Sequence, residues 1–261
     1  MSTLELRLHA WAGAALAALT FVPGMTFAAN GWSIDAGIEP STVDIGTREE
    51  RWRTTRIQGA WRDQNVGGLS VAVESQKRER ETDGLVSIGG FRRLDDWTLS
   101  GQISGGVDRD FIYRYSIEPQ ISRRLFGNFV GQAGYMYRKF DQTRVHLGTI
   151  GGTQYYANGE VEVRVSYGRN KPSDRAIKVL SLRGVRDDGS AFSYGGSATV
   201  GRNIYDAINV PGVGGNRAWI AGAFVRYRLD ANNSFRLDAT VGREEPSFRQ
   251  RGIALSYRRT F

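Results

Sequence analysis

Residues 160–167 read Glu-Val-Glu-Val-Arg-Val-Ser-Tyr, an unbroken alternation of polar and apolar side chains. Because successive side chains of a strand point to opposite faces of a sheet, this period of two predicts a β-strand with one apolar and one polar face. The same alternation recurs from Trp32 to the end of the chain, and no segment shows the 3.6-residue period of an amphipathic helix. We therefore expect an all-β protein.

The expected strands are long and numerous. Several run 12 or 13 residues, whereas strands of globular sheets average ~5 to 6 residues. A tilted strand needs ~9 to 11 residues to cross a bilayer. We expect about 14 strands, with 12 as the alternative, at residues 32–39, 51–62, 67–78, 84–93, 96–106, 112–124, 128–140, 144–156, 159–169, 175–186, 190–202, 217–229, 234–243 and 249–261.

The expected connections differ in length between the two ends of the strands. Those after even-numbered strands are short and rich in Gly, Asn and Asp, as tight hairpins require. Those after odd-numbered strands include two long loops, Pro40 to Glu50 and Asn203 to Asn216. Short turns on one rim and longer loops on the other are typical of outer-membrane barrels. We expect residues 29–261 to form one transmembrane antiparallel up-and-down β-barrel with both termini on the periplasmic side.

Residues 1–28 have the features of a secretory signal peptide. Arg7 and His9 precede an apolar stretch from Trp11 to Val22, and the small-residue site Thr26-Phe27-Ala28 follows. The alternative is a single membrane anchor, but the apolar stretch of 12 residues is shorter than the ~20 that a helical span needs. We expect cleavage after Ala28 and export from the cytosol.

Composition excludes several classes. The 261 residues include 33 Gly and no Cys, so no disulfide framework or thiol nucleophile is present. The mean hydropathy of −0.39 is too low for a polytopic helical membrane protein. The net charge of +8 first suggests a nucleic-acid partner, but export makes a genomic one improbable, and none is expected.

The chain ends in an apolar and aromatic strand that terminates in Phe. This ending resembles the terminal strand by which the barrel assembly machinery recognises bacterial outer-membrane proteins. An ordinary edge strand that ends in Phe is the alternative. The candidate assembly signal consists of Ile253, Leu255, Tyr257 and Phe261.

A known family shares these features. The signal peptide, the mature length, the opening Trp32-Ser-Ile-Asp-Ala-Gly, the Tyr- and Gly-rich hairpins and the ending Gly252-Ile-Ala-Leu-Ser-Tyr-Arg-Arg-Thr-Phe261 resemble the YaiO family of outer-membrane β-barrel proteins. The resemblance implies a Gram-negative outer-membrane location and a barrel similar in style to the terminal barrels of exopolysaccharide exporters. It implies no catalytic residues.

If the apolar face of each strand is turned toward lipid, the polar face lines a lumen. Isolated charges there would be costly, so we expect cross-strand pairs between Arg and carboxylates. Such pairs either fill a plugged interior or line a water-filled path, and the sequence leaves both open. The lumen candidates are Glu74, Arg114, Glu118, Glu162, Arg164, Arg226, Arg236 and Asp238.

Other basic residues fall near the ends of strands at the expected outer rim. Guanidinium groups bind phosphate through paired hydrogen bonds, so these residues are candidates for contact with lipopolysaccharide, the alternative being solvated loop charges. They are Arg48, Arg51, Lys77, Arg80, Lys171, Arg175, Arg217 and Arg249. Trp32, Trp52, Trp61, Trp97, Trp219, Tyr227, Tyr257 and Phe261 are expected in interfacial aromatic girdles.

His146 is the one His of the expected mature chain. It is the candidate general base of an outer-membrane hydrolase or acyltransferase, but a structural His is favoured, and no catalytic motif accompanies it. We expect a non-enzymatic barrel without metal or cofactor. The leading hypothesis is a pore or an export or assembly component for polar material, with polysaccharide and a polysaccharide-secretion complex as candidate partners. A structural barrel with a plugged lumen and a soluble periplasmic binding protein are the alternatives.

Overall fold

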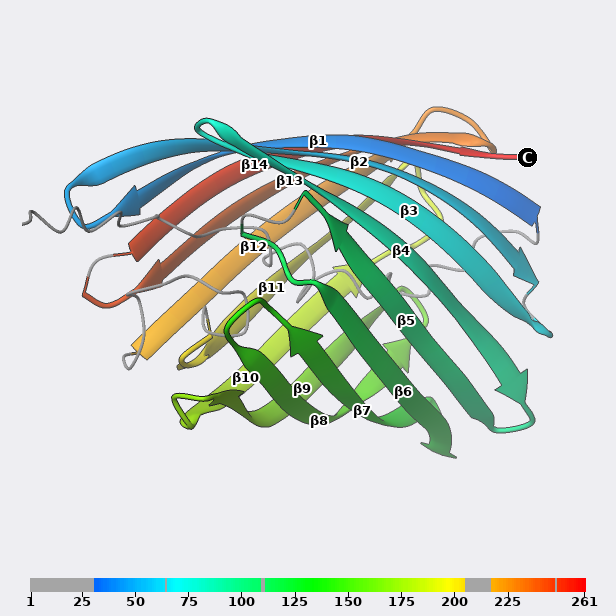
Figure 1. Cartoon of the computed structure of the whole chain (residues 1–261). Coiled ribbons are helices and arrows are strands. Elements are labelled where there is room, and N and C mark those ends of the chain that lie inside the picture. The colour runs from blue at the N-terminus through cyan, green and yellow to red at the C-terminus, as the bar shows by residue number, and fades with distance from the viewer. Residues whose placement is uncertain (1–30, 64, 109–110, 205–216, 247) are drawn as a thin grey trace, which may run out of the picture.

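The computed structural model describes residues 31–63, 65–108, 111–204, 217–246 and 248–261. These residues form one closed antiparallel β-barrel of 14 strands, in which every strand pairs with its neighbours in sequence and β1 pairs with β14 (Figure 1). The strands are β1 (Gly31–Ile45), β2 (Arg48–Asp63), β3 (Gly67–Arg78), β4 (Glu81–Leu94), β5 (Trp97–Val107), β6 (Tyr115–Phe126), β7 (Phe129–Lys139), β8 (Arg144–Tyr156), β9 (Gly159–Lys171), β10 (Arg175–Arg186), β11 (Phe192–Arg202), β12 (Arg217–Arg228), β13 (Asn233–Glu244) and β14 (Phe248–Thr260).

Closure leaves no strand edge unpaired. The strands contain 11 to 16 residues, which satisfies the ~9 to 11 that a tilted strand needs to cross a bilayer. In hydrocarbon, backbone N–H and C=O groups must find their partners within the protein, and a closed barrel provides them. The all-β, 14-stranded barrel expected from the sequence is confirmed.

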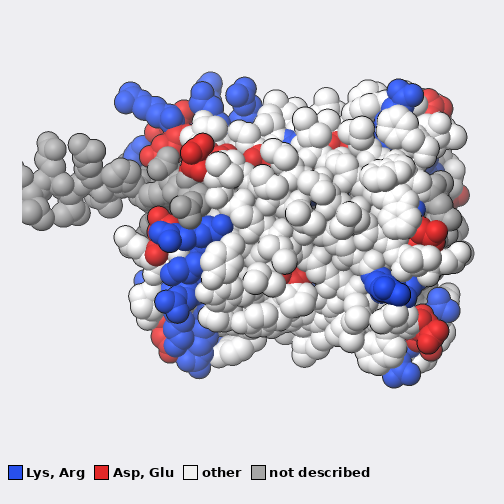
Figure 2. All heavy atoms as spheres, turned by 45° about the vertical axis from the view of Figure 1, so that its right-hand side comes forward, with Lys and Arg blue, Asp and Glu red and all other residues white. Residues whose placement is uncertain are grey.

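The two faces of the barrel differ as the alternation predicts. On β9, Val161, Val163 and Val165 are exposed on the outside, whereas Glu162 is buried on the inside. Equivalent outward positions around the barrel carry Ile, Leu, Val and aromatic side chains. Figure 2 shows the result, a broad band with few charged atoms between two charged rims. Such a band is the surface that a barrel presents to lipid.

Both ends of the described chain, Gly31 and Phe261, lie at one end of the barrel, which we call the terminal rim. Its connections follow the even-numbered strands, and Asp63 and Asp230 fasten two of them by accepting hydrogen bonds from backbone N–H groups two and three residues ahead. The opposite end, which we call the loop rim, carries the connections that follow the odd-numbered strands. Both termini of the barrel therefore lie on the same side.

Three expected strand ranges, 67–78, 144–156 and 175–186, match the observed ones. The expected long loop from Pro40 to Glu50 is wrong, because β1 continues to Ile45 and a two-residue turn leads into β2. Gly46 of this turn has φ +62°, a left-handed conformation that glycine adopts readily. Pro40 is tolerated inside β1 because the pairing with β14 omits Glu39 and Pro40, where the missing N–H is not needed.

The expected strand 112–124 begins too early. Ile112 and Tyr113 belong to the connection between β5 and β6, and their side chains are buried. Strand pairing continues without interruption through Gly151-Gly152 of β8. A Cβ on Gly152 would lie 2.3 Å from the ring of Phe129, so this glycine permits close packing against an aromatic side chain.

Candidate functional site: the barrel interior and the basic collar

Seven of the eight lumen candidates occupy the inward face of their strands. Residues directly opposite each other on paired strands share a face, and Glu118 lies opposite Gln102, as Arg226 lies opposite Ser193. Arg114 differs, because it precedes β6 at the loop rim, where its half-exposed side chain pairs with Asp141 at 2.5 Å. The inward candidates are Glu74, Glu118, Glu162, Arg164, Arg226, Arg236 and Asp238.

Inward arginines and carboxylates form ion pairs, as expected. Three of them join neighbouring strands: Arg138 with Glu118 at 2.8 Å, Arg183 with Glu160 at 2.6 Å, and Arg258 with Asp35 at 3.0 Å. Two others join residues two apart on one strand, Arg164 with Glu162 and Arg236 with Asp238. The second type was not anticipated, although side chains at i and i+2 of a strand share a face. Most of these pairs are partly buried, so the interior is a charged and hydrogen-bonded wall.

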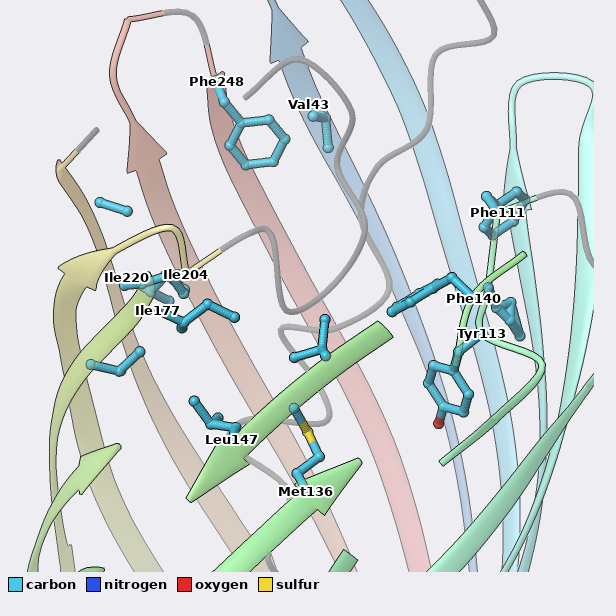
Figure 3. Close-up of a cluster of buried hydrophobic side chains, with 14 of the residues drawn as sticks. Val43, Phe111, Tyr113, Met136, Phe140, Leu147, Ile177, Ile204, Ile220 and Phe248 are labelled. Atoms are coloured by element: carbon cyan, nitrogen blue, oxygen red, sulfur yellow. The ribbon is translucent and has the colours of Figure 1, made fainter. Parts of the chain in front are cut away.

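The interior changes character toward the loop rim, where apolar side chains gather. Figure 3 shows these side chains coming from strands all around the barrel and from connections of the loop rim, those between β5 and β6, β7 and β8, and β11 and β12. We call them the apolar plug: Val43, Trp52, Leu85, Phe111, Ile112, Tyr113, Met136, Phe140, Val145, Leu147, Ile177, Val179, Ile204, Ala218, Ile220 and Phe248.

Residues Phe111–Tyr113 bring the β5–β6 connection into the apolar plug. The carboxylate of Asp83 on β4 accepts hydrogen bonds at 2.8 Å from the backbone N–H groups of both Phe111 and Ile112. Tyr113 packs edge-on against Phe140, with ring centroids 6.0 Å apart. These contacts hold the connection inside the barrel instead of above it.

Two buried arginines support the same segment. The Arg78 guanidinium lies 3.7 Å from the ring centroid of Phe111, and that of Arg138 lies 5.0 Å from the ring centroid of Tyr113. The Arg78 side chain is 5% exposed and points into the barrel. Trp52, expected in a girdle, also points inward, where its indole N–H donates to Glu50 at 3.0 Å. The alternation of the sequence predicts both inward directions, because Trp52 and Arg78 share the face of Arg56 and Glu74.

Outward-facing basic side chains lie near the loop rim on β2, β3 and β7 to β14. This set includes five of the rim candidates: Arg51, Lys77, Lys171, Arg217 and Arg249. Arg80 lies in the β3–β4 turn. Arg48 and Arg175 occupy positions on the inward face of their strands. Figure 2 shows basic side chains along the left edge of the barrel. We call the outward set the basic collar: Arg51, Arg53, Lys77, Lys139, Arg144, Arg169, Lys171, Lys178, Arg202, Arg217, Arg243, Arg249 and Arg251.

Part of the basic collar brings like charges together. Arg202 lies directly opposite both Lys178 and Arg217, and Arg243 lies opposite Arg249. Like charges at opposed positions destabilise a sheet unless an anion lies between them. A hollow of about 500 Å³ is lined by several of these residues together with Trp219 and Glu245.

Acidic neighbours offset the charge of some collar residues. Arg169 pairs with Asp174 at 2.9 Å, and Lys171 pairs with the same carboxylate. The hydrogen bond from Lys171 and the charge of Arg169 lower the pKa of the Asp174 carboxyl. Arg251 of β14 pairs with Asp44 at 3.4 Å, so acidic side chains offset only part of the charge of the collar.

His146 faces outward near the loop rim. Its Nδ1 lies 2.6 Å from the Tyr135 hydroxyl, and its ring lies 4.9 Å from that of Tyr137. The neighbouring Thr149 faces inward, where its hydroxyl bonds that of Ser166 at 2.7 Å. The Thr149 hydroxyl and the candidate base His146 therefore lie on opposite faces of the sheet.

Among the residues described, no group of three or more His, Cys, Asp or Glu side chains could hold a metal ion. The same part of the chain contains no helix long and apolar enough to cross a membrane.

The candidate assembly signal lies on the outward face of β14 and at its end. Ile253, Leu255 and Phe261 are exposed, and the Phe261 N–H donates to the Trp32 carbonyl at 2.8 Å. The end of the chain therefore closes the barrel against β1.

Comparison with known proteins shows the fold. No family model and no curated protein matches the chain, so the resemblance to the YaiO family stays a prediction. The Pseudomonas putida toluene transporter TodX is 11% identical with a TM-score of 0.62, covering 97% of this chain and 95% of its own. A bacterial polysaccharide outer membrane secretin is 11% identical with a TM-score of 0.58, covering 89% and 99%. Omp33 of Acinetobacter baumannii is 13% identical with a TM-score of 0.53, covering 88% and 99%. The chain shares its fold with outer-membrane β-barrel proteins.

Proposed function

We propose that the protein is a non-enzymatic outer-membrane barrel that conducts polar solutes, saccharides among them, through its interior. An apolar outer band and a polar inner face are the surfaces that such a conductor needs. A barrel of 14 strands is wider than barrels of ~8 strands, which side chains fill, and narrower than porins of 16 to 18. The observation that carries the proposal is the inner wall of paired charges, which remains polar from the terminal rim up to the apolar plug.

The terminal rim is assigned to the periplasm in this proposal, because short turns and both chain ends occupy the periplasmic side of outer-membrane barrels. The apolar plug then lies at the outer end of the path and narrows it. The fold likeness to a polysaccharide outer membrane secretin is compatible with saccharide as cargo. Any partner in a secretion complex would meet the terminal rim.

Planar-bilayer recording of the refolded protein tests this function. We expect discrete conductance steps, and swelling of proteoliposomes in isosmotic sugar that increases as the sugar becomes smaller. Asp83→Ala, which releases Phe111–Tyr113 from β4, should raise the conductance. If neither the wild type nor this variant conducts, the pore function is wrong.

The apolar plug favours a second function, a structural barrel whose interior never opens. Sixteen side chains form this plug, and buried apolar clusters resist opening in proportion to the area that they remove from water. The absence of conductance in both proteins, together with normal folding, would support this structural role. No observation favours catalysis by His146.

We further propose that the basic collar binds the phosphate groups of lipopolysaccharide. The support is the row of opposed like charges at Lys178, Arg202 and Arg217, since a phosphate between them would relieve their repulsion. Native mass spectrometry with bisphosphorylated lipid A should show retention that Arg202→Gln plus Arg217→Gln reduces. The matched control is Arg123→Gln, an outward residue of β6 near the terminal rim. Equal retention of lipid A by both variants would contradict the proposal.

A further inference from the structure

We propose that the interior near the terminal rim holds a binding site for the anionic group of a solute, a carboxylate or a phosphate, centred on Arg226. The proposal deepens the conducting function above, and its transport part rests on that function. The site itself is a property of the barrel wall and can be tested without transport.

The charge balance of this part of the wall supports the site. Five inward arginines, Arg62, Arg226, Arg228, Arg236 and Arg258, lie near the terminal-rim ends of β2, β12, β13 and β14. Three carboxylates near them are each paired with one arginine: Asp35 with Arg258, Asp187 with Arg228, and Asp238 with Arg236. A fourth inward carboxylate, Glu39 of β1, lies near Asp238 and forms no ion pair with a described residue. Two of the five arginines therefore have no carboxylate paired with them.

Those two are Arg226 and Arg62. Within the described part of the chain, neither forms an ion pair or a hydrogen bond. Arg258 is a like-charged neighbour of both, and Arg236 is a second one of Arg226. Asp187 and Asp35 also lie near Arg226, but their effect on it is smaller than that of the two arginines, and each is already paired with another arginine. An inward charge without a partner in a low-dielectric wall is costly, and like-charged neighbours increase that cost. A bound anion removes both penalties.

Several hydrogen-bond donors lie close together around Arg226. Arg226 of β12 lies directly opposite Arg236 of β13 on one side and Ser193 of β11 on the other. The Ser193 side chain is 1% exposed, and its hydroxyl finds no hydrogen-bond partner among the described residues. Arg236 is held in place by Asp238, at 2.8 Å from its Nε, and by the Phe224 ring, 3.9 Å from its guanidinium.

This arrangement determines the class of ligand. A guanidinium group presents a fork of N–H donors that matches the two oxygens of a carboxylate or a phosphate, and a serine hydroxyl adds one more donor. Arg226 is only partly buried and so remains accessible from the lumen. A neutral sugar offers no charge to this site. Acidic sugars and sugar phosphates are therefore the polar solutes that the wall favours.

Isothermal titration calorimetry of the refolded barrel in detergent tests binding directly. The probes are glucuronate, which carries a carboxylate, glucose 6-phosphate, which carries a phosphate, and glucose, which carries neither. We expect one or both anions to bind, and glucose not to bind. The comparison of the two anions shows which oxyanion the site prefers.

Variants locate the site. Arg226→Gln should weaken anion binding by about tenfold, because a hydrogen-bonded charge contributes roughly 1.5 kcal/mol or more. Arg226→Lys keeps the charge and should retain part of the affinity. Arg186→Gln is the matched control, since Arg186 ends β10 at the same rim but faces outward. Heat-modifiable gel mobility verifies that each variant folds.

Measuring the ion selectivity of the channel tests the proposed anion site and the proposed conducting function separately. In a KCl gradient across a bilayer, the wild type should favour chloride, and Arg226→Gln should reduce this preference while Arg186→Gln leaves it unchanged. Conductance without anion binding, or with equal binding by Arg226→Gln, would overturn the site and leave the pore. Anion binding that depends on Arg226 in a barrel that never conducts would keep the site and overturn the pore.

Discussion

Asp83 of β4 and Phe111 of the β5–β6 connection are joined by a hydrogen bond of 2.8 Å from the Phe111 backbone N–H to the Asp83 carboxylate, which also accepts one from Ile112. Asp83 is fully buried, and Phe111 is 1% exposed. One side chain on the barrel wall thus fixes the position of a connection that carries three residues of the apolar plug.

Removing this carboxylate should release the connection. In Asp83→Ala, two buried N–H groups lose a charged acceptor, and each such loss costs roughly 1.5 to 3 kcal/mol. We expect chymotrypsin to cleave after Phe111 or Tyr113 in this variant and not in the wild type. Asp63→Ala is the matched control, because Asp63 accepts from two backbone N–H groups at the terminal rim. Cleavage at the same sites in the control would contradict the assignment.

The ion pair between Glu118 and Arg138 should contribute strongly to stability. The Arg138 side chain is 1% exposed, so Glu118→Gln leaves a buried charge without its counter-ion. We expect the free energy of unfolding in urea, measured in lipid vesicles, to fall by about 3 kcal/mol. Asp141→Ala breaks the half-exposed pair with Arg114 and should cost at most ~1 kcal/mol. Equal losses in the two variants would show that burial does not set the contribution.

Adjacent residues of β5 test which face meets lipid. Ile103 is exposed on the outside in the apolar band, and Gln102 faces inward opposite Glu118. Ile103→Arg should lower stability by roughly 2 to 4 kcal/mol, as an arginine near the bilayer midplane does. Gln102→Arg places the same side chain beside a carboxylate and should be tolerated. A larger loss for Gln102→Arg would reverse the assignment of the faces.

The terminal residue should matter for assembly in cells more than for the stability of the folded barrel. Phe261 exposes its ring outward, and its backbone N–H closes the pairing with Trp32. Phe261→Ala keeps the backbone bond but removes the ring of the proposed assembly signal. We expect cells to contain less of this variant as folded, heat-modifiable barrel in their membranes, whereas its refolding in detergent micelles should equal that of the wild type. A refolding defect of the same size would assign the ring a structural role instead.

The sequence by itself determined the fold class, the strand count and the face of most strand residues. Alternation in stretches such as 160–167 requires only neighbouring residues, because the period of two is a local property of an extended backbone. The alternation also predicts the inward direction of Trp52, which was expected in a girdle, because Trp52 shares the face of Arg56.

The tertiary structure alone decided which inward groups meet. The pairing of Arg258 with Asp35 depends on β14 lying beside β1, which closure of the sheet produces from residues 223 apart in sequence. The inward position of Phe111–Tyr113 likewise depends on Asp83, which lies 28 residues earlier than Phe111. That Arg226 forms no ion pair became visible only when the partners of Asp35, Asp187 and Asp238 had been identified. Local periodicity sets the direction of a side chain, whereas register and closure set its neighbours.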